Sequence, residues 1–126
     1  MQRPEQAKET LLAAIKLDPK HGPAHNNLGL VLLSLNDLHG AKTAFTAALD
    51  ARIDDLVAME NLGVLLLFHE ADAKAASVYL ERRLRIMQQR KLRITAEDYR
   101  VVGLAALFAD NENAVSYTHL TLPTKA

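Results

Sequence analysis

The sequence predicts an all-α array of helical hairpins, and three observations support that fold class. The stretch NNLGLVLL at residues 26–33 returns as ENLGVLLL at residues 60–67, 34 residues later, and self-similarity at such a period is typical of stacked repeats. Apolar residues make up 49% of the 126 residues and aromatic residues only 5%, which favours packed helices over sheet. Apolar side chains also recur at three- and four-residue spacing, as in Leu28, Leu32 and Leu35, and this spacing indicates helical faces.

The first copy of the repeat divides into two predicted helices. The first helix runs over residues 23–35, and Pro23 stands in its first turn, where a missing N–H costs nothing. The turn 36–40 (NDLHG) follows, and the second helix spans residues 41–51. This copy is therefore expected to form one helical hairpin.

The second copy is expected to repeat this arrangement. Its first helix is predicted over residues 56–69, and either Asp54 or Asp55 can serve as the N-cap. Its second helix is predicted to start near residue 73.

The chain then departs from the 34-residue period. Gly103 follows Gly63 by 40 residues, and no Gly or Pro interrupts residues 77–93. We therefore expect the second helix of this copy to be extended by more than one turn, about 9 Å at about 1.5 Å per residue. Thr95, with Asp98 three residues later, forms a variant capping box that is expected to open the last helix.

The pattern resembles the tetratricopeptide repeat family, and the resemblance covers nearly the whole chain up to Ala114. That family places Leu-Gly within the first helix of each repeat, small and aromatic residues on the second helix, and a proline at the end. The matching residues of the first copy are His25, Leu28, Gly29, Leu32, Ala41, Phe45 and Ala48. Those of the second copy are Met59, Leu62, Gly63, Leu66, Ala75 and Tyr79. The flanking segments contribute Ala7, Leu11, Ala14 and Pro19 before them and Tyr99, Val102, Gly103 and Ala106 after them.

The resemblance implies a right-handed solenoid in which Gly29, Gly63 and Gly103 let two helices cross closely. A close crossing is the expected compensation for these residues, because glycine inside a helix costs about 1 kcal/mol relative to alanine. The small residues expected across the crossing are Ala41, Ala48 and Ala75. Phe45 and Tyr79 are expected to join neighbouring repeats into one core.

Three positions depart from the family pattern. Ile53 and Met87 stand where the terminal proline is expected, and Arg82 stands where a small residue is expected, so the second repeat should pack differently there. By register, the chain divides into the second half of a repeat (1–20), one repeat (21–54), a repeat with an extended second helix (55–94) and the first helix of a further repeat (95–114). Because solenoids normally end in polar capping repeats, we expect this chain to be a truncated part of a longer array.

Residues 115–126, VSYTHLTLPTKA, break the helical pattern, since they are rich in β-branched residues and contain Pro123. One codon choice for this segment resembles the transposon mosaic end and adapter used in preparing DNA sequencing libraries. We therefore expect it to be a non-native tail that should be excluded from fold reasoning. The alternative is a genuine β-like tail.

The composition argues against several classes of function. Lys and Arg number 15 and Asp and Glu number 15, so no net charge attracts nucleic acid or an anionic membrane. The absence of cysteine excludes disulfides and Cys-ligated metals. The apolar runs fall short of the ~18 residues that a membrane helix needs, and no signal peptide is recognisable. No phosphate loop, nucleophile elbow or pair of catalytic acids is present, so neither an enzyme nor a cofactor is expected.

The resemblance implies a protein-interaction scaffold that binds a partner segment on a concave face lined by the first helices of successive repeats. The groove residues expected from the family's register are Asn26, Leu30, Leu33, Glu60, Val64, Leu67, Phe68, Arg100 and Leu104. Beside them the same register places Pro23, Ser34, Val57, Glu97, Leu107 and Phe108. Such a surface suits a protein or peptide with apolar anchors. The alternative is that these side chains are covered by further repeats or by self-association through uncapped ends.

Three sharper site hypotheses fit less well. The carboxylate clamp of chaperone-binding family members needs lysine, asparagine and arginine at set positions, of which only Asn61 is present. His21 and His25 lie four residues apart, but Gly22 and Pro23 keep His21 out of the helix, so no metal site is expected. The basic residues in ERRLRIMQQRKLR spread around their helix and are expected to be solvated, with RNA binding as the alternative.

The alternative function is that the chain is the repeat region of a larger enzyme, such as a glycosyltransferase or sulfotransferase. In the reading frame after Ala114, further 34-residue repeats would favour a scaffold. An α/β domain with a cofactor motif would favour an enzyme.

Overall fold

Three helices begin at an aspartate whose side chain caps the backbone. The carboxylates of Asp37, Asp55 and Asp72 each accept a hydrogen bond from the N–H group three residues later, at 2.8, 3.0 and 3.1 Å. These bonds satisfy N–H groups that the first helical turn leaves without a partner. Of the two residues predicted as a cap, Asp55 takes that role, whereas Asp54 accepts a hydrogen bond from Arg52 at 3.2 Å.

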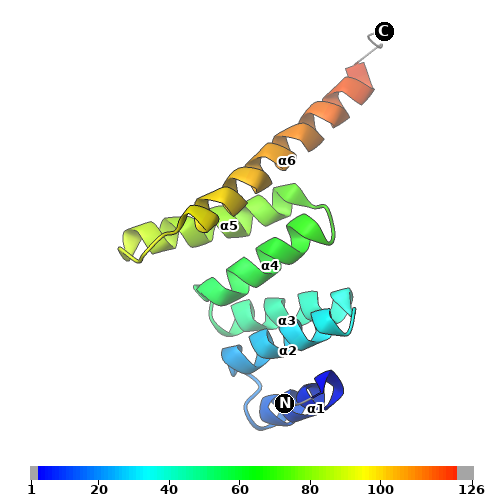
Figure 1. Ribbon diagram of the computed structural model, residues 1–126, viewed down its shortest axis with the longest axis vertical. Helices are drawn as coiled ribbons and strands as arrows, with labels where there is room; N and C mark the ends of the chain where they lie inside the picture. The colour runs from blue at the N-terminus through cyan, green and yellow to red at the C-terminus, as the bar shows by residue number, and fades with distance from the viewer. Residues whose placement is uncertain (1–2, 122–126) are drawn as a thin grey trace.

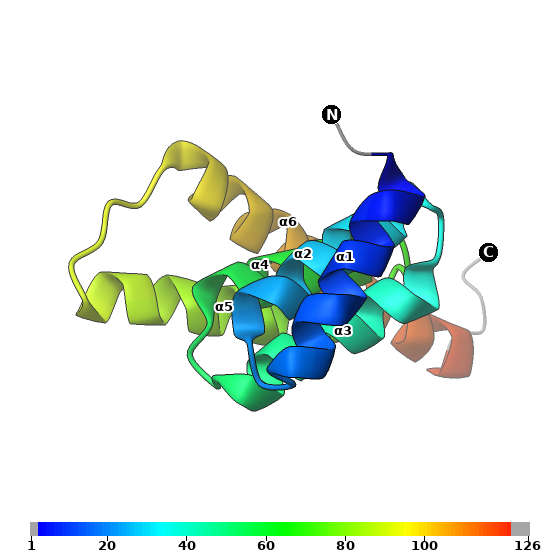
Figure 2. The same cartoon turned by 90° about the horizontal axis from the view of Figure 1, so that it is seen from below.

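The computed structural model describes the backbone of residues 3–121 and the side chains of residues 3–110. That part of the chain contains no strand and forms the helices α1 (Pro4–Leu17), α2 (Gly22–Ser34), α3 (Leu38–Ala51), α4 (Leu56–Phe68), α5 (Ala73–Gln89) and α6 (Ala96–Thr121). Consecutive helices pack against one another, and they rise as a stack from α1 at one end to α6 at the other (Figure 1). Seen from below, α1 covers the near end of the stack (Figure 2). The predicted all-α array of helical hairpins is confirmed.

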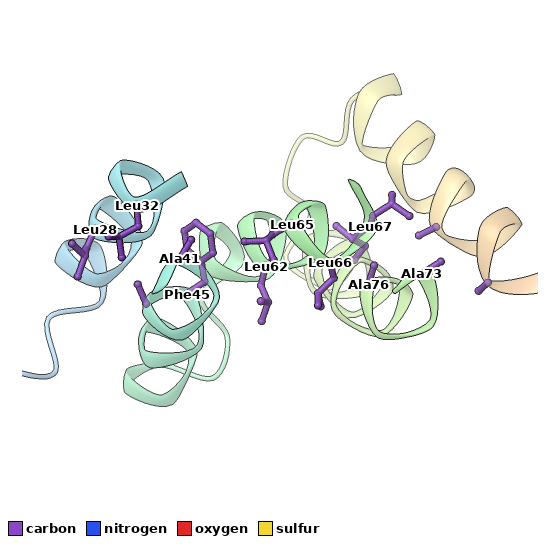
Figure 3. Close-up of a cluster of buried hydrophobic side chains, with 14 residues drawn as sticks. Leu28, Leu32, Ala41, Phe45, Leu62, Leu65, Leu66, Leu67, Ala73 and Ala76 are labelled. Carbon is purple, nitrogen blue, oxygen red and sulfur yellow. The ribbon is translucent and has the colours of Figure 1, made fainter. Parts of the chain in front are cut away.

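One apolar cluster runs through α2, α3, α4, α5 and α6 (Figure 3). Phe45 and Met59 are fully buried, and burial of a side chain of this size contributes roughly 1.5–3 kcal/mol. The helix α1 differs from the others, because it has no buried residue and only Leu11 and Ile15 pack against the cluster, partly buried. The described core is therefore centred on α2 to α5.

Gly29 and Gly63 each make room for one large side chain from the following helix. A Cβ atom added to Gly29 would lie 2.3 Å from Cε1 of Phe45, and one added to Gly63 would lie 2.6 Å from Cγ of Leu80. The close crossing predicted from these glycines is therefore present, but a bulky side chain fills it rather than an alanine. Gly103 differs from both, because a Cβ atom there would meet no atom of the described residues within 4 Å.

In the second repeat, the turn between the two helices is one residue longer than in the first repeat. Residues 35–37 separate α2 from α3, whereas residues 69–72 separate α4 from α5. The capping residues Asp37 and Asp72 consequently lie 35 positions apart rather than 34. An alanine with positive φ, Ala71 (φ 52°), lies in the longer turn, and Asn36 (φ 61°) lies in the shorter one.

This shift corrects three sequence-based assignments. The residues of α5 that correspond to Ala41, Phe45 and Ala48 are Ala76, Leu80 and Arg83, not Ala75, Tyr79 and Arg82. Burial agrees with the corrected register, because Ala76 and Leu80 are 0% and 3% exposed. Tyr79 is only partly buried against the core, and Arg82 is exposed. The arginine that departs from the family pattern is therefore Arg83.

The six extra residues before Gly103 are distributed over three places rather than placed in one helix. The helix α5 has 17 residues against 14 in α3. The loop that follows spans residues 90–95 instead of the four residues 52–55, and the turn before α5 holds one more residue. The predicted extension of α5 is therefore present but shorter, about 4.5 Å at about 1.5 Å per residue.

The predicted capping box at the start of α6 is confirmed. The backbone N–H of Thr95 donates to Oδ2 of Asp98 at 2.8 Å, and the N–H of Asp98 donates to Oγ1 of Thr95 at 3.2 Å. At its other end, α6 continues to Thr121, so the described backbone of the predicted tail is helical. Residues 122–126, and the side chains after Asp110, lie outside the described part of the chain.

Candidate functional site

A small cavity of about 140 Å³ lies between α4, α5 and α6. Its lining includes five residues that the register placed on the groove, namely Glu60, Val64, Phe68, Glu97 and Arg100. Phe68 is 52% exposed at this cavity, which is unusual for a large aromatic side chain. The cavity therefore combines an apolar wall from Val64 and Phe68 with charged groups from α4 and α6.

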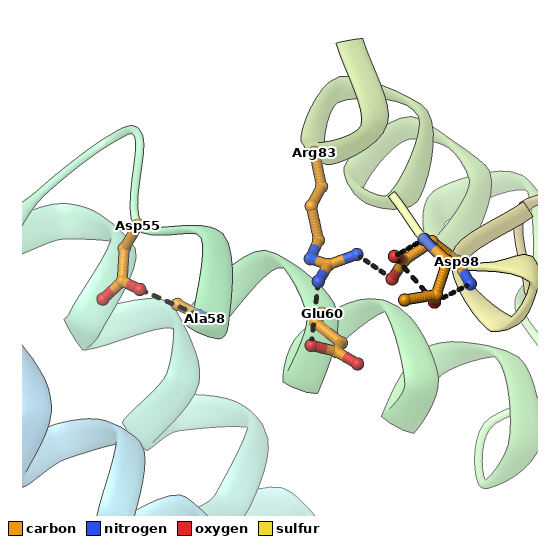
Figure 4. A network of polar contacts seen from close by, with 6 residues as sticks. Asp55, Ala58, Glu60, Arg83 and Asp98 are labelled. Carbon is orange, nitrogen blue, oxygen red and sulfur yellow. Dashed lines mark hydrogen bonds and ion pairs between the residues drawn. The ribbon is translucent and has the colours of Figure 1, made fainter. Parts of the chain in front are cut away.

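Arg83 reaches this cavity from α5 and joins three helices (Figure 4). Its Nη1 donates to Oδ1 of Asp98 on α6 at 3.0 Å, and its Nη2 lies 3.2 Å from Oε2 of Glu60 on α4. The side chains of Arg83 and Asp98 are 15% and 14% exposed, whereas that of Glu60 is 51% exposed. Arg83 is thus held by a partly buried partner and by a solvent-facing one.

Two carboxylates in the first turn of α6, those of Glu97 and Asp98, are stabilised in their charged form. The backbone N–H of Thr95, and then the guanidinium of Arg83, hold the pKa of Asp98 below its usual range. Arg100 donates two hydrogen bonds to Glu97, at 2.8 and 2.6 Å, and these lower the pKa of Glu97 and raise that of Arg100. The guanidinium of Arg100 is therefore already paired within its own helix.

The remaining predicted groove residues lie elsewhere in the stack. Leu30 is 47% exposed on α2 and does not line the cavity. Leu33 and Leu104 are partly buried and pack against the core, and Leu67 is only 6% exposed. These three leucines contribute mainly to the packing between helices in this chain.

Asn26 also differs from the expectation, because its side chain is buried at 5% exposure. Its Nδ2 donates to Oδ2 of Asp55 at 2.9 Å, which ties α2 to the N-terminus of α4. It lies at a separate, more polar cavity of about 580 Å³ that His21 and Arg52 also line. Asn26 therefore holds two repeats together, and its amide is not on the surface formed by Val64 and Phe68.

The histidines near α2 make local contacts. Nδ1 of His21 accepts a hydrogen bond from the N–H of Ala24 at 3.1 Å, and Nε2 of His25 lies 2.7 Å from the carbonyl oxygen of Pro19. Among the residues that the structure describes, no three His, Cys, Asp or Glu side chains gather as metal ligands would.

The basic residues of α5 and of the loop after it are divided between ion pairs and solvent. Arg83 is engaged as described above, and Arg90 forms an ion pair with Asp54. Arg82 and Arg85 are exposed. Because carboxylates occupy part of the set, the helix does not present all its arginines as one free basic surface.

Comparison with protein families identifies the kind of repeat. A family model described as tetratricopeptide repeat matches residues 1–55 and, again, residues 28–84. The chain belongs to the tetratricopeptide repeat family. A search of curated proteins gave no significant match.

Membership in this family indicates a helical repeat fold of the protein-interaction type. Tetratricopeptide repeats typically form non-catalytic modules that bind proteins or peptides, and their stacked helices create extended surfaces between repeats. None of the described helices is both long and apolar enough to span a lipid bilayer. The sequence predicted Glu60, Val64, Phe68 and Arg100 as groove residues, and all four line the cavity between α4, α5 and α6. Arg83 and Asp98, which were not predicted, reach this cavity through the one-residue longer turn before α5 and the capping box of α6.

Proposed function

We propose that this chain is a protein-interaction scaffold that binds a partner segment across α4 and α6, at the cavity formed by Val64, Phe68 and Arg100. The observation that carries the proposal is the exposed aromatic ring of Phe68, which lies beside this cavity. Arg83 also lines the cavity and is held in place by its ion pair with Asp98. An exposed aromatic side chain at a pre-formed hollow is the kind of feature that anchors a bound peptide.

The size of the cavity favours one apolar anchor from the partner. A volume of about 140 Å³ accommodates a side chain of aliphatic size but not a folded element. The family's register places further apolar surface on the same face, where Leu107 and Phe108 of α6 are 52% and 40% exposed. An extended or helical segment with more than one apolar residue would therefore gain additional burial.

The charged groups favour a basic residue next to that anchor. Three carboxylates, Glu60, Glu97 and Asp98, line the cavity with two arginines, Arg83 and Arg100, so one negative charge is not compensated. Glu60 is also half exposed. A lysine or arginine flanking the anchor would complement this charge and improve the rate and specificity of binding.

The test is to select binding peptides from a random display library against the immobilised chain and to measure their affinity by fluorescence anisotropy. We expect Phe68→Ser to weaken binding at least about tenfold, which is about 1.4 kcal/mol. The matched control is Leu17→Ser, which removes an 89% exposed leucine from α1, outside the cavity lining. Equal affinities for both variants, or an equal loss in both, would refute the proposal.

A further inference from the structure

The face of α6 that carries Gly103 is open, whereas the same face of α4 is covered by α5. Met59 and Gly63 of α4 are buried, and Leu80 of α5 sits directly over Gly63. The corresponding residues of α6, 40 positions later, are Tyr99, which is 53% exposed, and Gly103, which has nothing within 4 Å of an added Cβ atom. Among the residues that the structure describes, none fills on α6 the notch that receives a bulky side chain in the two preceding repeats.

The opposite end of the stack presents the complementary face. The loops 18–21 and 52–55 have equal length, so α1 corresponds to α3 with a constant offset of 34 residues. On α3, Phe45 packs against Gly29 of α2, and Ala41, Ala44, Phe45 and Ala48 are all 0–5% exposed. Their counterparts on α1 are Ala7, Thr10, Leu11 and Ala14. No residue of α1 is buried, so this face, with Leu11 in the place of Phe45, is only partly covered.

We propose that α1 of one copy of this chain docks on α6 of a second copy, with Leu11 seated at Gly103 of that copy. The docked pair would continue the packing that α3 makes on α2 and α5 makes on α4, which are established interfaces of this fold. Leucine is also the residue that fills the notch of Gly63. This surface differs from the cavity at Phe68 and does not depend on the function proposed for it.

The chemistry of both faces supports this choice of occupant. Tyr99, Val102, Gly103 and Ala106 on one side, and Ala7, Thr10, Leu11 and Ala14 on the other, include no charged residue, although charged residues make up 24% of the chain. Docking would thus bury apolar surface without burying an unpaired charge.

The helices α1 and α6 lie at opposite ends of the stack (Figure 1), so the two faces would meet between copies rather than within one. Such a contact is head-to-tail and does not close into a dimer, and it generates open chains of increasing length.

Two variants block one face each. Thr10→Lys places a charge at an exposed position on the α1 face that carries Leu11. Gly103→Gln fills the open notch of α6, where an added Cβ atom meets no described atom within 4 Å. In sedimentation velocity, the unmodified chain should form species larger than a dimer as concentration rises, while each variant alone should weaken association at least about tenfold. Circular dichroism establishes that each variant remains folded.

Mixing the two variants gives the decisive result. The chain carrying Gly103→Gln keeps an intact α1 face, and the chain carrying Thr10→Lys keeps an intact notch, so the mixture should form a one-to-one dimer that grows no further. The matched control is Leu12→Lys, which adds the same charge at a 45% exposed position whose counterpart on α3, Thr46, stays exposed. This control should associate like the unmodified chain. An unmodified chain that stays monomeric, a mixture that forms no dimer, or a control that also loses association would overturn the proposal.

Discussion

The ring of Phe45 occupies the space next to Gly29, so that a Cβ atom on this glycine would lie 2.3 Å from Cε1 of the ring. Phe45 is fully buried and cannot move away without disturbing the core. We expect Gly29→Ala to lower the free energy of unfolding by roughly 1–3 kcal/mol, because the overpacking exceeds the gain of about 1 kcal/mol from replacing glycine within a helix. Urea denaturation followed by circular dichroism measures this loss.

Gly103→Ala makes the same chemical change, but we expect it to raise the free energy of unfolding. No atom lies within 4 Å of the added methyl group, so the intrinsic helix preference alone should act, with a gain of up to about 1 kcal/mol. The same urea denaturation tests it, at a concentration where the chain is monomeric. A stability change of the same sign in both glycine variants would contradict the role assigned to Phe45.

Ala71 adopts a positive φ of 52° in the turn before α5. This conformation costs an alanine roughly 1 kcal/mol, whereas glycine adopts it readily. We therefore expect Ala71→Gly to leave stability unchanged or to raise it by up to about 1 kcal/mol. Ala47→Gly, within α3, is the control and should lower stability by about 1 kcal/mol, because its backbone is helical. Thermal unfolding of the two variants distinguishes these outcomes.

The sequence predicted the order and type of the helices because each apolar face and each cap depends on residues close together in the chain. Thr95 and Asp98 form the predicted capping box, and Asp55 forms one of the two predicted caps. The spacing of Gly29 and Gly63 predicted a close crossing correctly, but not which side chain enters it. The length of the turn between the two helices decides which side chain enters the crossing. Because the turn before α5 holds one extra residue, Leu80 rather than Tyr79 faces Gly63.

The candidate site was less predictable for the same reason. Glu60, Val64, Phe68 and Arg100 meet at one cavity as the family's register implies. Asn26 does not, since a nearby carboxylate, Asp55, binds its amide and buries it. Contacts between side chains far apart in the sequence decide these cases, and the spacing of residues along one helix carries no information about them.

Arg83 is expected to stabilise the junction of α4, α5 and α6 through Asp98 more than through Glu60. We expect Arg83→Met to lower stability by roughly 1–3 kcal/mol, because it removes the charged partner of a carboxylate that is only 14% exposed. Glu60→Gln should cost less than about 0.5 kcal/mol, because Glu60 is 51% exposed and its ion pair is screened by water. Chemical denaturation of both variants checks this order, and an equal effect of the two would contradict it.

Asp98 should make the stability of the chain depend on pH in the acidic range. Hydrogen bonds from the backbone of Thr95, and then from Arg83, lower its pKa in the folded state. Its stabilising contribution is therefore fully present above the unfolded-state pKa of about 3.9 and is lost as the pH falls through the lower, folded-state pKa. The Tm of the unmodified chain should fall as the pH drops below about 4, and Asp98→Asn should have a lower Tm at neutral pH and a shallower acid dependence.

Glu97→Gln is the control, because the pKa of Glu97 is also lowered but its side chain is 64% exposed, so its removal should change the slope much less. If Asp98→Asn and the unmodified chain lost the same stability on acidification, protonation of Asp98 would not be the cause of the acid dependence.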